Sequence, residues 1–259
     1  MNLNTIIGFI AAISVFFTTV YLSLRNATVL LDGKSALIVI GGTIAVSVIC
    51  FSLDKIVMLL KVFFRRMVGL NKINYMELVE QIVVLSNAYK SGMTTFETAV
   101  NQTKHFFLKD AAEVLFWLES DVTPEKLRKL LDNKADTFFS NYMTDANSFR
   151  TLAKFPPAFG LMGTTLGMIA LLQGLGEEGA AEQIGPSMAI ALITTLYGLF
   201  VANFILIPIA ENLSKQAQED LTMRLMVVEG IMLIQEGEPT KYVEESVKSF
   251  LLPSERQAA

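Results

Sequence analysis

Charged residues are scarce in this chain, at 18% of 259 residues against about 25% in ordinary soluble domains. Four stretches contain no Asp, Glu, Lys or Arg at all: Ile6–Leu24, Ser35–Leu53, Phe155–Leu175 and Ile184–Ile209. Each is long enough to cross a bilayer as a helix, which takes about 20 residues. Buried helices of a soluble core are the alternative, but four uncharged runs of this length in one soluble domain would be exceptional. The sequence therefore predicts a polytopic, all-α membrane protein with four transmembrane helices.

Cysteine and histidine are nearly absent. The single cysteine, Cys50, excludes an intramolecular disulfide and is expected to be a packed thiol within the second run. The single histidine, His105, cannot form a histidine-based metal site. We find no Walker loop, nucleophile elbow or Rossmann glycine pattern, so neither an enzyme nor a bound cofactor or resident metal is indicated. A net charge of −4 with no dominant basic patch also argues against a nucleic-acid partner.

Basic residues gather in one loop and indicate the topology. Of 21 Lys and Arg, fourteen lie within residues 54–154, while the acidic segment 176–183 has none. The positive-inside rule places residues 54–154 in the cytoplasm, and with them both termini. The first run lacks the basic flank of a signal peptide and is expected to be retained. We therefore expect transmembrane helices in 1–53 and 155–210, a cytoplasmic helical domain in 54–154 and a cytoplasmic helical tail in 211–259.

The loop and tail show helical periodicity rather than disorder. Apolar residues between 75 and 100 predict a helical hairpin interrupted near Ser91-Gly92. Residues 111–118 form a short amphipathic segment, and Thr123-Pro124 is typical of a helix start, predicting a helix through Leu131. In the tail, the fourth membrane helix is expected to continue into the cytoplasm as far as residue 237, followed by a short helix over 240–250.

Glycine and proline concentrate in the third uncharged run. Gly160, Gly163 and Gly167 fall on one helical face and allow a second helix to approach closely. Pro157 removes a backbone donor and is expected to bend or loosen the helix near its cytoplasmic end. Close packing alone is the alternative explanation for the three glycines.

Threonines are the main polar residues of the last two runs. In an antiparallel helix pair, Thr164 and Thr165 would lie at the same depth as Thr194 and Thr195, near mid-membrane. Such hydroxyls can line a hydrated pathway or coordinate a hard cation, although a single membrane threonine often bonds only to its own helix. Ion transport normally needs an ionisable group within the membrane. Because the four runs have none, we expect a partner subunit to supply a helix carrying an Asp or Glu.

Four sequence blocks, together with the order of two helices, a loop of about 100 residues and two further helices, resemble a known family. The chain is similar to the A subunit of bacterial flagellar stators, the MotA/PomA family of the MotA/TolQ/ExbB superfamily. The blocks are Ile38-Val-Ile-Gly-Gly-Thr43, Pro157-Ala-Phe-Gly-Leu-Met-Gly-Thr164, Gly185-Pro-Ser-Met-Ala-Ile-Ala-Leu-Ile-Thr-Thr-Leu-Tyr-Gly198 and Val228-Glu-Gly-Ile-Met-Leu-Ile-Gln-Glu-Gly237.

The resemblance implies a ring of five such subunits around two copies of a MotB/PomB-like B subunit, whose helix brings the ion-carrying Asp. Passage of protons or sodium ions in the bacterial inner membrane would then drive the flagellar rotor protein FliG through the cytoplasmic loop. It also implies roles for individual residues: the ion pathway at Pro157, Thr164, Thr194 and Thr195, a second helix-shaping proline at Pro208 and an outer-side acidic position at Asp32.

The rotor-facing motif of the family is only partly present. Lys90 and Glu97 occupy its second basic and its acidic position, but Tyr89 stands where Arg is usual. This departure leaves open how far the rotor contact is electrostatic and whether the rotor is the ordinary flagellar one. Without the resemblance, Lys90 and Glu97 are interpreted as two solvated surface charges.

Three functions compete at this point. An ion-driven torque generator agrees best with the motifs. An ExbB/TolQ-like subunit energising an outer-membrane or gliding system is the alternative, but such chains resemble a three-helix layout, whereas two uncharged runs precede the loop here. A passive scaffold or a self-sufficient channel is the third. For the ion, a third hydroxyl from Thr194 beside Thr164 and Thr195 would favour transient sodium coordination, so we lean slightly to sodium over the proton.

Overall fold

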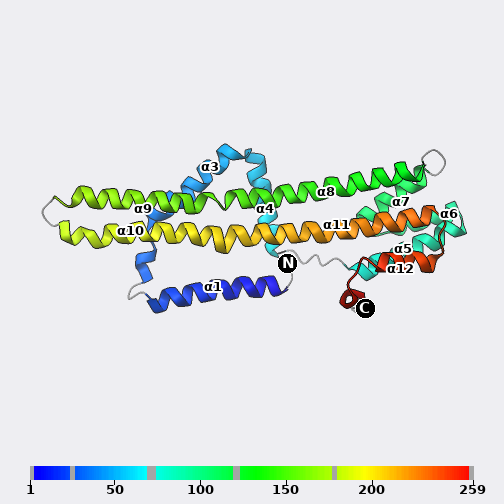
Figure 1. Cartoon of the computed structure of the whole chain (residues 1–259), viewed down its shortest axis with the longest axis horizontal. Helices are drawn as coiled ribbons and strands as arrows, with labels where there is room; N and C mark the ends of the chain where they lie inside the picture. Colours follow the sequence, from blue (N-terminus) through cyan, green and yellow to red (C-terminus); the bar gives the residue numbers. More distant parts are fainter. Residues whose placement is uncertain (1–2, 24–26, 69–73, 119–122, 177–179, 257–259) are drawn as a thin grey trace. The chain divides into compact units, whose positions relative to one another are not determined.

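The computed structural model describes residues 3–23, 27–68, 74–118, 123–176 and 180–256, and over these ranges the chain contains helices and no strand (Figure 1). The residues group into two compact units. Unit 1 comprises Met1–Lys72 with Thr144–Ser214, and unit 2 comprises Ile73–Met143 with Lys215–Ala259. The predicted all-α fold is confirmed.

Unit 1 contains the apolar helices. It is built from α1 (Leu3–Ser23), η1 (Ala27–Leu30), α2 (Gly33–Ala36), the π-helical η2 (Leu37–Gly41), α3 (Gly42–Cys50), α4 (Leu53–Val68), α9 (Phe155–Gly174), α10 (Ala180–Phe200), the π-helical η3 (Val201–Leu206) and the beginning of α11 (Ile207–Gln235). Three stretches of the described chain are long and apolar enough to cross a membrane, namely Thr28–Cys50, Pro124–Gly174 and Ile184–Gln235, and a shorter apolar helical stretch covers Ile10–Ser23. Each of these four stretches overlaps one of the four uncharged runs.

Unit 2 surrounds a hydrophobic core. Its helices are α5 (Tyr75–Ser91), α6 (Met93–Gln102), α7 (Phe106–Leu118), most of α8 (Pro124–Leu152), the remainder of α11, α12 (Thr240–Lys248) and α13 (Pro253–Arg256). Phe96, Phe107 and Met226 are among its fully buried side chains. The predicted hairpin is present as α5 and α6. Gly92 between them has φ of +118°, a conformation that side-chain-bearing residues rarely adopt and that allows the chain to turn from one helix into the next.

Two sequence expectations differ from the structure. The helix that begins at Pro124 does not end near Leu131 but continues to Leu152. The apolar pattern did not predict the continuation because its later buried positions include the small Ala135 and Ala146, which add little to such a pattern. Cys50, expected to be packed, is exposed at the end of α3.

Candidate functional site

The contact between α9 and α10 is made by backbone atoms and short side chains. A Cβ added to Gly160 would lie 3.1 Å from Thr195 Cα, one added to Gly163 would lie 2.8 Å from Thr194 Cβ, and one added to Gly167 would lie 2.8 Å from Ala191 Cβ. Gly198 has the same role on α10, where a Cβ would lie 3.0 Å from the carbonyl carbon of Pro156. All four glycines therefore serve the close approach of the two helices.

Thr164 and Thr195 face one another across this contact, and their hydroxyl groups are hydrogen-bonded to each other. The Thr164 hydroxyl also lies 2.9 Å from the carbonyl oxygen of Ala191, and the Thr195 hydroxyl lies 3.2 Å from that of Gly160. Both threonines are half-buried. The structure thus brings together two of the predicted pathway residues, one from each helix.

Thr194 points elsewhere, although it is adjacent to Thr195 in the sequence. Its hydroxyl is fully buried and lies 2.6 Å from the carbonyl oxygen of Ile190 and 2.9 Å from the hydroxyl of Ser35 in α2. Thr165 is exposed and donates to the carbonyl oxygen of Met162 at 2.7 Å. Sequence reasoning did not identify Ser35, whose only local signal is its position at the start of the second uncharged run.

The predicted helix-shaping prolines lie at interruptions of regular α-helical geometry. α9 begins at Phe155, so Pro156 and Pro157 are in its first turn, where the missing N–H groups would have no partner within the helix in any case. A turn at residues 153–154 separates α9 from α8, so the regular helix is interrupted directly before the two prolines. Pro208 lies inside the continuous helical stretch formed by α10, η3 and α11, directly after the wider turns of η3.

The remaining predicted residues are spread over both units. In unit 1, Asp32 caps α2, since its carboxylate accepts a hydrogen bond from the Ser35 N–H at 2.7 Å. In unit 2, Lys90 and Glu97 are exposed on α5 and α6. Tyr89 is half-buried and packs edge-on against Phe96, with ring centroids 5.2 Å apart.

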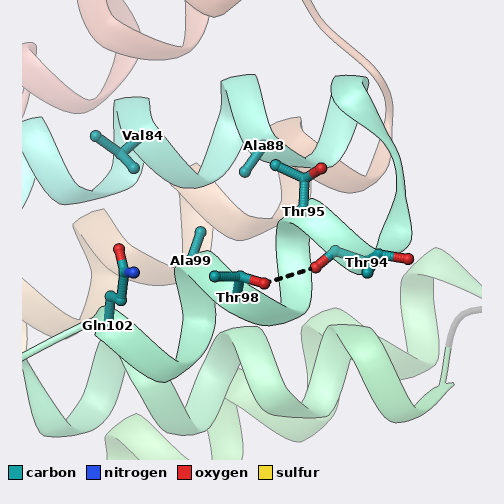
Figure 2. Close-up of a pocket in the computed structure, with 7 residues that line it drawn as sticks. All are labelled: Val84, Ala88, Thr94, Thr95, Thr98, Ala99 and Gln102. Atoms are coloured by element: carbon teal, nitrogen blue, oxygen red, sulfur yellow. Dashed lines mark hydrogen bonds between the residues drawn. The ribbon is translucent and has the colours of Figure 1, made fainter.

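An open groove of about 380 Å³ lies between α5 and α6, close in sequence to these rotor-motif residues. Threonine and alanine side chains dominate its lining, and Figure 2 shows Thr98 donating a hydrogen bond back along α6 to the carbonyl oxygen of Thr94. The groove is lined by Val84, Ala88, Thr94, Thr95, Thr98, Ala99 and Gln102. This lining contains no charged residue.

A second polar cluster in unit 2 was not anticipated from the sequence. Arg224, only 5% exposed, pairs with Asp220 at 2.6 Å, and its guanidinium lies 3.9 Å from the ring centroid of Phe138. His105 precedes α7 and accepts a hydrogen bond at Nδ1 from the Leu108 N–H. Burial lowers the pKa of His105 and the nearby Arg224 cation lowers it further, while Asp220 and Glu77 oppose the shift. His105 therefore acts as a neutral helix cap.

Among the residues that the structure describes, no group of three or more His, Cys, Asp or Glu side chains is arranged to hold a metal ion. The polar groups between α9 and α10 are hydroxyls and carbonyls. This arrangement can pass protons along hydrogen bonds or offer oxygen ligands to a cation, but it contains no acid that could carry a proton by itself.

Comparison with known proteins identifies the family. The model of the MotA/TolQ/ExbB proton channel family matches residues 90–226. Motility protein A of Borreliella burgdorferi is 30% identical over 99% of this chain and 96% of the relative, and chemotaxis protein PomA of Vibrio alginolyticus is 27% identical over 99% and 98%.

Solved structures agree with these matches at the level of fold. The structure of C. jejuni MotAB matches with a TM-score of 0.86 and 20% identity, over 98% of this chain and 97% of that one. From the family model and the full-length relatives together, we conclude that the chain belongs to the MotA/TolQ/ExbB proton channel family.

Proposed function

We propose that this chain is the ion-conducting A subunit of a bacterial flagellar stator, which couples proton or sodium flow to torque on the rotor. Relatives named Motility protein A and PomA match nearly its whole length. Membership of a proton channel family makes ion translocation, not enzymatic catalysis, the activity to be explained.

The observation that carries the proposal is the hydroxyl pair of Thr164 and Thr195. The pair lies within two helices that contain no charged residue between Phe155 and Leu175 or between Ile184 and Ile209. Polar groups in such segments are costly unless they bond to each other or to passing ions and water. Thr194, predicted as a third hydroxyl beside the pair, is directed toward Ser35. The proposed pathway therefore has two hydroxyls, Pro157 at its end, and no structural preference for sodium over the proton.

The absence of an acid between Phe155 and Leu175 and between Ile184 and Ile209 supports a partner. We propose a MotB/PomB-like B subunit that supplies the ion-carrying Asp, in a ring of five A subunits around two B subunits. The matched structures are of MotAB complexes, which supports a B-type partner. Mass measurement of the purified membrane complex tests the composition: a chain that purifies alone and conducts ions excludes the shared site.

Contact with the rotor is proposed at Lys90 and Glu97. Both are exposed, as a binding surface requires, whereas Tyr89 contributes packing rather than charge because its ring is held against Phe96. With FliG as the rotor partner, charge reversal at Lys90 and Glu97 should reduce torque while the protein stays in the membrane. Unchanged torque would contradict this assignment.

The location and topology belong to the same proposal. We place the chain in the inner membrane with transmembrane helices in 1–53 and 155–210, a cytoplasmic domain in 54–154, a cytoplasmic tail in 211–259, and Asp32 on the outer side. The concentration of basic residues in 54–154 supports this orientation. Reporter fusions at both termini test it, because a terminus found outside the cell would reverse it.

Thr195→Ala provides the decisive test of the pathway. The substitution removes one hydroxyl of the pair and leaves the Thr164 hydroxyl with its bond to Ala191. We expect ion-driven swimming to be lost or strongly reduced with membrane levels unchanged, and Thr195→Ser to restore it. Thr165→Ala is the matched control, because that hydroxyl is exposed and bonded only within its own helix. Normal motility in Thr195→Ala would refute the pathway, and swimming speed with and without sodium identifies the ion.

A further inference from the structure

Helix α10 presents two faces to the helices around it in unit 1. The face toward α9 is formed by residues spaced four and three apart: Ala191, Thr195 and Gly198. The same spacing one position earlier gives a second face, turned by about 100° around the helix and formed by Ile190, Thr194 and Tyr197. Contacts that hold the second face in place therefore also set the direction of the first.

Polar groups of η1 and α2 hold this second face. The Tyr197 hydroxyl donates a hydrogen bond to the carbonyl oxygen of Leu30, the last residue of η1. The Ser35 hydroxyl in α2 lies 2.9 Å from the Thr194 hydroxyl and 3.3 Å from the carbonyl oxygen of Ile190. Ser35 and Thr194 are both 0% exposed, so bulk solvent does not reach these hydrogen bonds.

Ser35 is itself fixed by the start of its own helix. Its N–H donates to the carboxylate of Asp32 at 2.7 Å, the hydrogen bond of an N-cap to the third residue of a helix. Thr194 is fixed from the other side, because its methyl carbon Cγ2 occupies the space that a side chain at Gly163 of α9 would need. The Thr194 side chain is thus held between α2 and α9, and its branched Cβ leaves it few alternative rotamers.

We propose that Ser35 is a positioning residue of the ion pathway: by binding Thr194 it sets the rotation of α10 about its own axis and keeps the Thr195 hydroxyl opposite Thr164. A helix rotation of about 25° would move each Cα, at a radius of about 2.3 Å, by roughly 1 Å and the side-chain oxygens by more. A hydrogen bond between two hydroxyls tolerates only about 0.5 Å of change in distance, so such a rotation would open the pair. The inference rests on the ion pathway proposed above and assigns to it a residue outside the contact between α9 and α10.

Ser35→Ala tests the role without leaving a buried donor unpaired, because the Thr194 hydroxyl keeps the carbonyl oxygen of Ile190 at 2.6 Å. A hydrogen bond between membrane helices contributes about three-fold to an equilibrium, and we expect the driving-ion concentration for half-maximal swimming speed to rise by about the same factor. A loss of folded protein alone would lower the maximal speed and leave that concentration unchanged. Ser47→Ala is the matched control, because Ser47 is also buried in the second uncharged run but its hydroxyl lies 2.6 Å from the carbonyl oxygen of Thr43 in its own helix. An unchanged concentration in Ser35→Ala, or an equal rise in Ser47→Ala, would overturn the positioning role.

Combination with Thr194→Val tests whether the two hydroxyls act through one bond. Valine removes the hydroxyl and keeps a methyl group against Gly163. We expect Thr194→Val to raise the half-maximal ion concentration as Ser35→Ala does, and the double variant to raise it no further. A rise of about nine-fold in the double variant, the product of two independent effects, would overturn the proposal.

Thr195→Ala, measured alongside, separates this inference from the pathway itself. If Thr195→Ala stops swimming while Ser35→Ala leaves the half-maximal ion concentration unchanged, the pathway stands and the positioning role is wrong. If both variants swim normally at every ion concentration, the pathway and the positioning role are both wrong.

Discussion

Replacing Gly198 with Ala should force α9 and α10 apart. The new Cβ would lie 3.0 Å from the carbonyl carbon of Pro156 and 3.1 Å from Pro157 Cα, where ordinary contacts begin at 3.4 Å, and it would be closer still to the Pro156 carbonyl oxygen. These are backbone atoms, which cannot rotate out of the way as the end of a long side chain can. The two helices must therefore separate.

The cost follows from that separation. A gap of about 0.5 Å removes roughly a quarter of the dispersion energy of each contact it opens. Overpacking of this kind costs about 1–3 kcal/mol, and contact with backbone points to the upper part of the range. The higher helix propensity of Ala offsets up to about 1 kcal/mol. We expect a net loss of about 1–2 kcal/mol, which corresponds to a fall of roughly 2–8 °C in the unfolding midpoint.

Gly174→Ala provides the matched control, because Gly174 lies in α9, the other helix of the pair, and a Cβ there would have nothing within 4 Å. Thermal unfolding of both purified variants in the same detergent measures the difference. The midpoint of Gly198→Ala should fall, and that of Gly174→Ala should stay level or rise. Equal midpoints for the two variants would show that α9 and α10 do not touch at this position.

Three further predictions concern the single histidine and two ion pairs. Because the folded-state pKa of His105 is lowered, the unfolded chain binds the proton first as the pH drops, and stability should fall below about pH 6.5. His105→Asn retains a cap but does not titrate, so it should remove this part of the pH dependence of the unfolding midpoint. An unchanged slope of the midpoint against pH in that variant would refute the role of His105. Arg224→Met leaves the Asp220 carboxylate without its partner and should cost about 3 kcal/mol; equilibrium unfolding should show partial recovery when Asp220→Leu is added. Lys55→Asp should destabilise the protein by about 1 kcal/mol, and adding Asp145→Lys should restore stability if the ion pair contributes.

Local patterns predicted the features that depend on neighbouring residues. Charge-free runs located the apolar helices, and the three- and four-residue spacing of Gly160, Gly163 and Gly167 predicted the face that meets α10. Counting residues from the ends of the third and fourth runs predicted that Thr164 and Thr165 share a depth with Thr194 and Thr195, and in the structure Thr164 meets Thr195. Each of these inferences uses helical geometry, which is fixed by sequence distance alone.

Features that depend on distant residues could not be predicted. Ser35 meets Thr194 from 159 positions away, and no local signal selects it over the other hydroxyls. Arg224 resembled one charge among many in a charged tail, yet Phe107 and Phe138 from other helices enclose it. The pattern indicated a disturbance near Pro157 but not the residue at which α9 starts, so the position of the break between α8 and α9 could not be predicted.

The hydrogen bonds of the Thr164 and Thr195 pair can run in either of two directions. A hydroxyl has one proton to donate and rotates freely about its C–O bond. In one arrangement Thr195 donates to Thr164, which donates to the Ala191 carbonyl; in the other, Thr164 donates to Thr195, which donates to the Gly160 carbonyl. The heavy atoms are the same in both, but the dipole of the pair is reversed. A positive charge approaching from either side of the pair can therefore meet an oxygen lone pair after two bond rotations, without any movement of the helices.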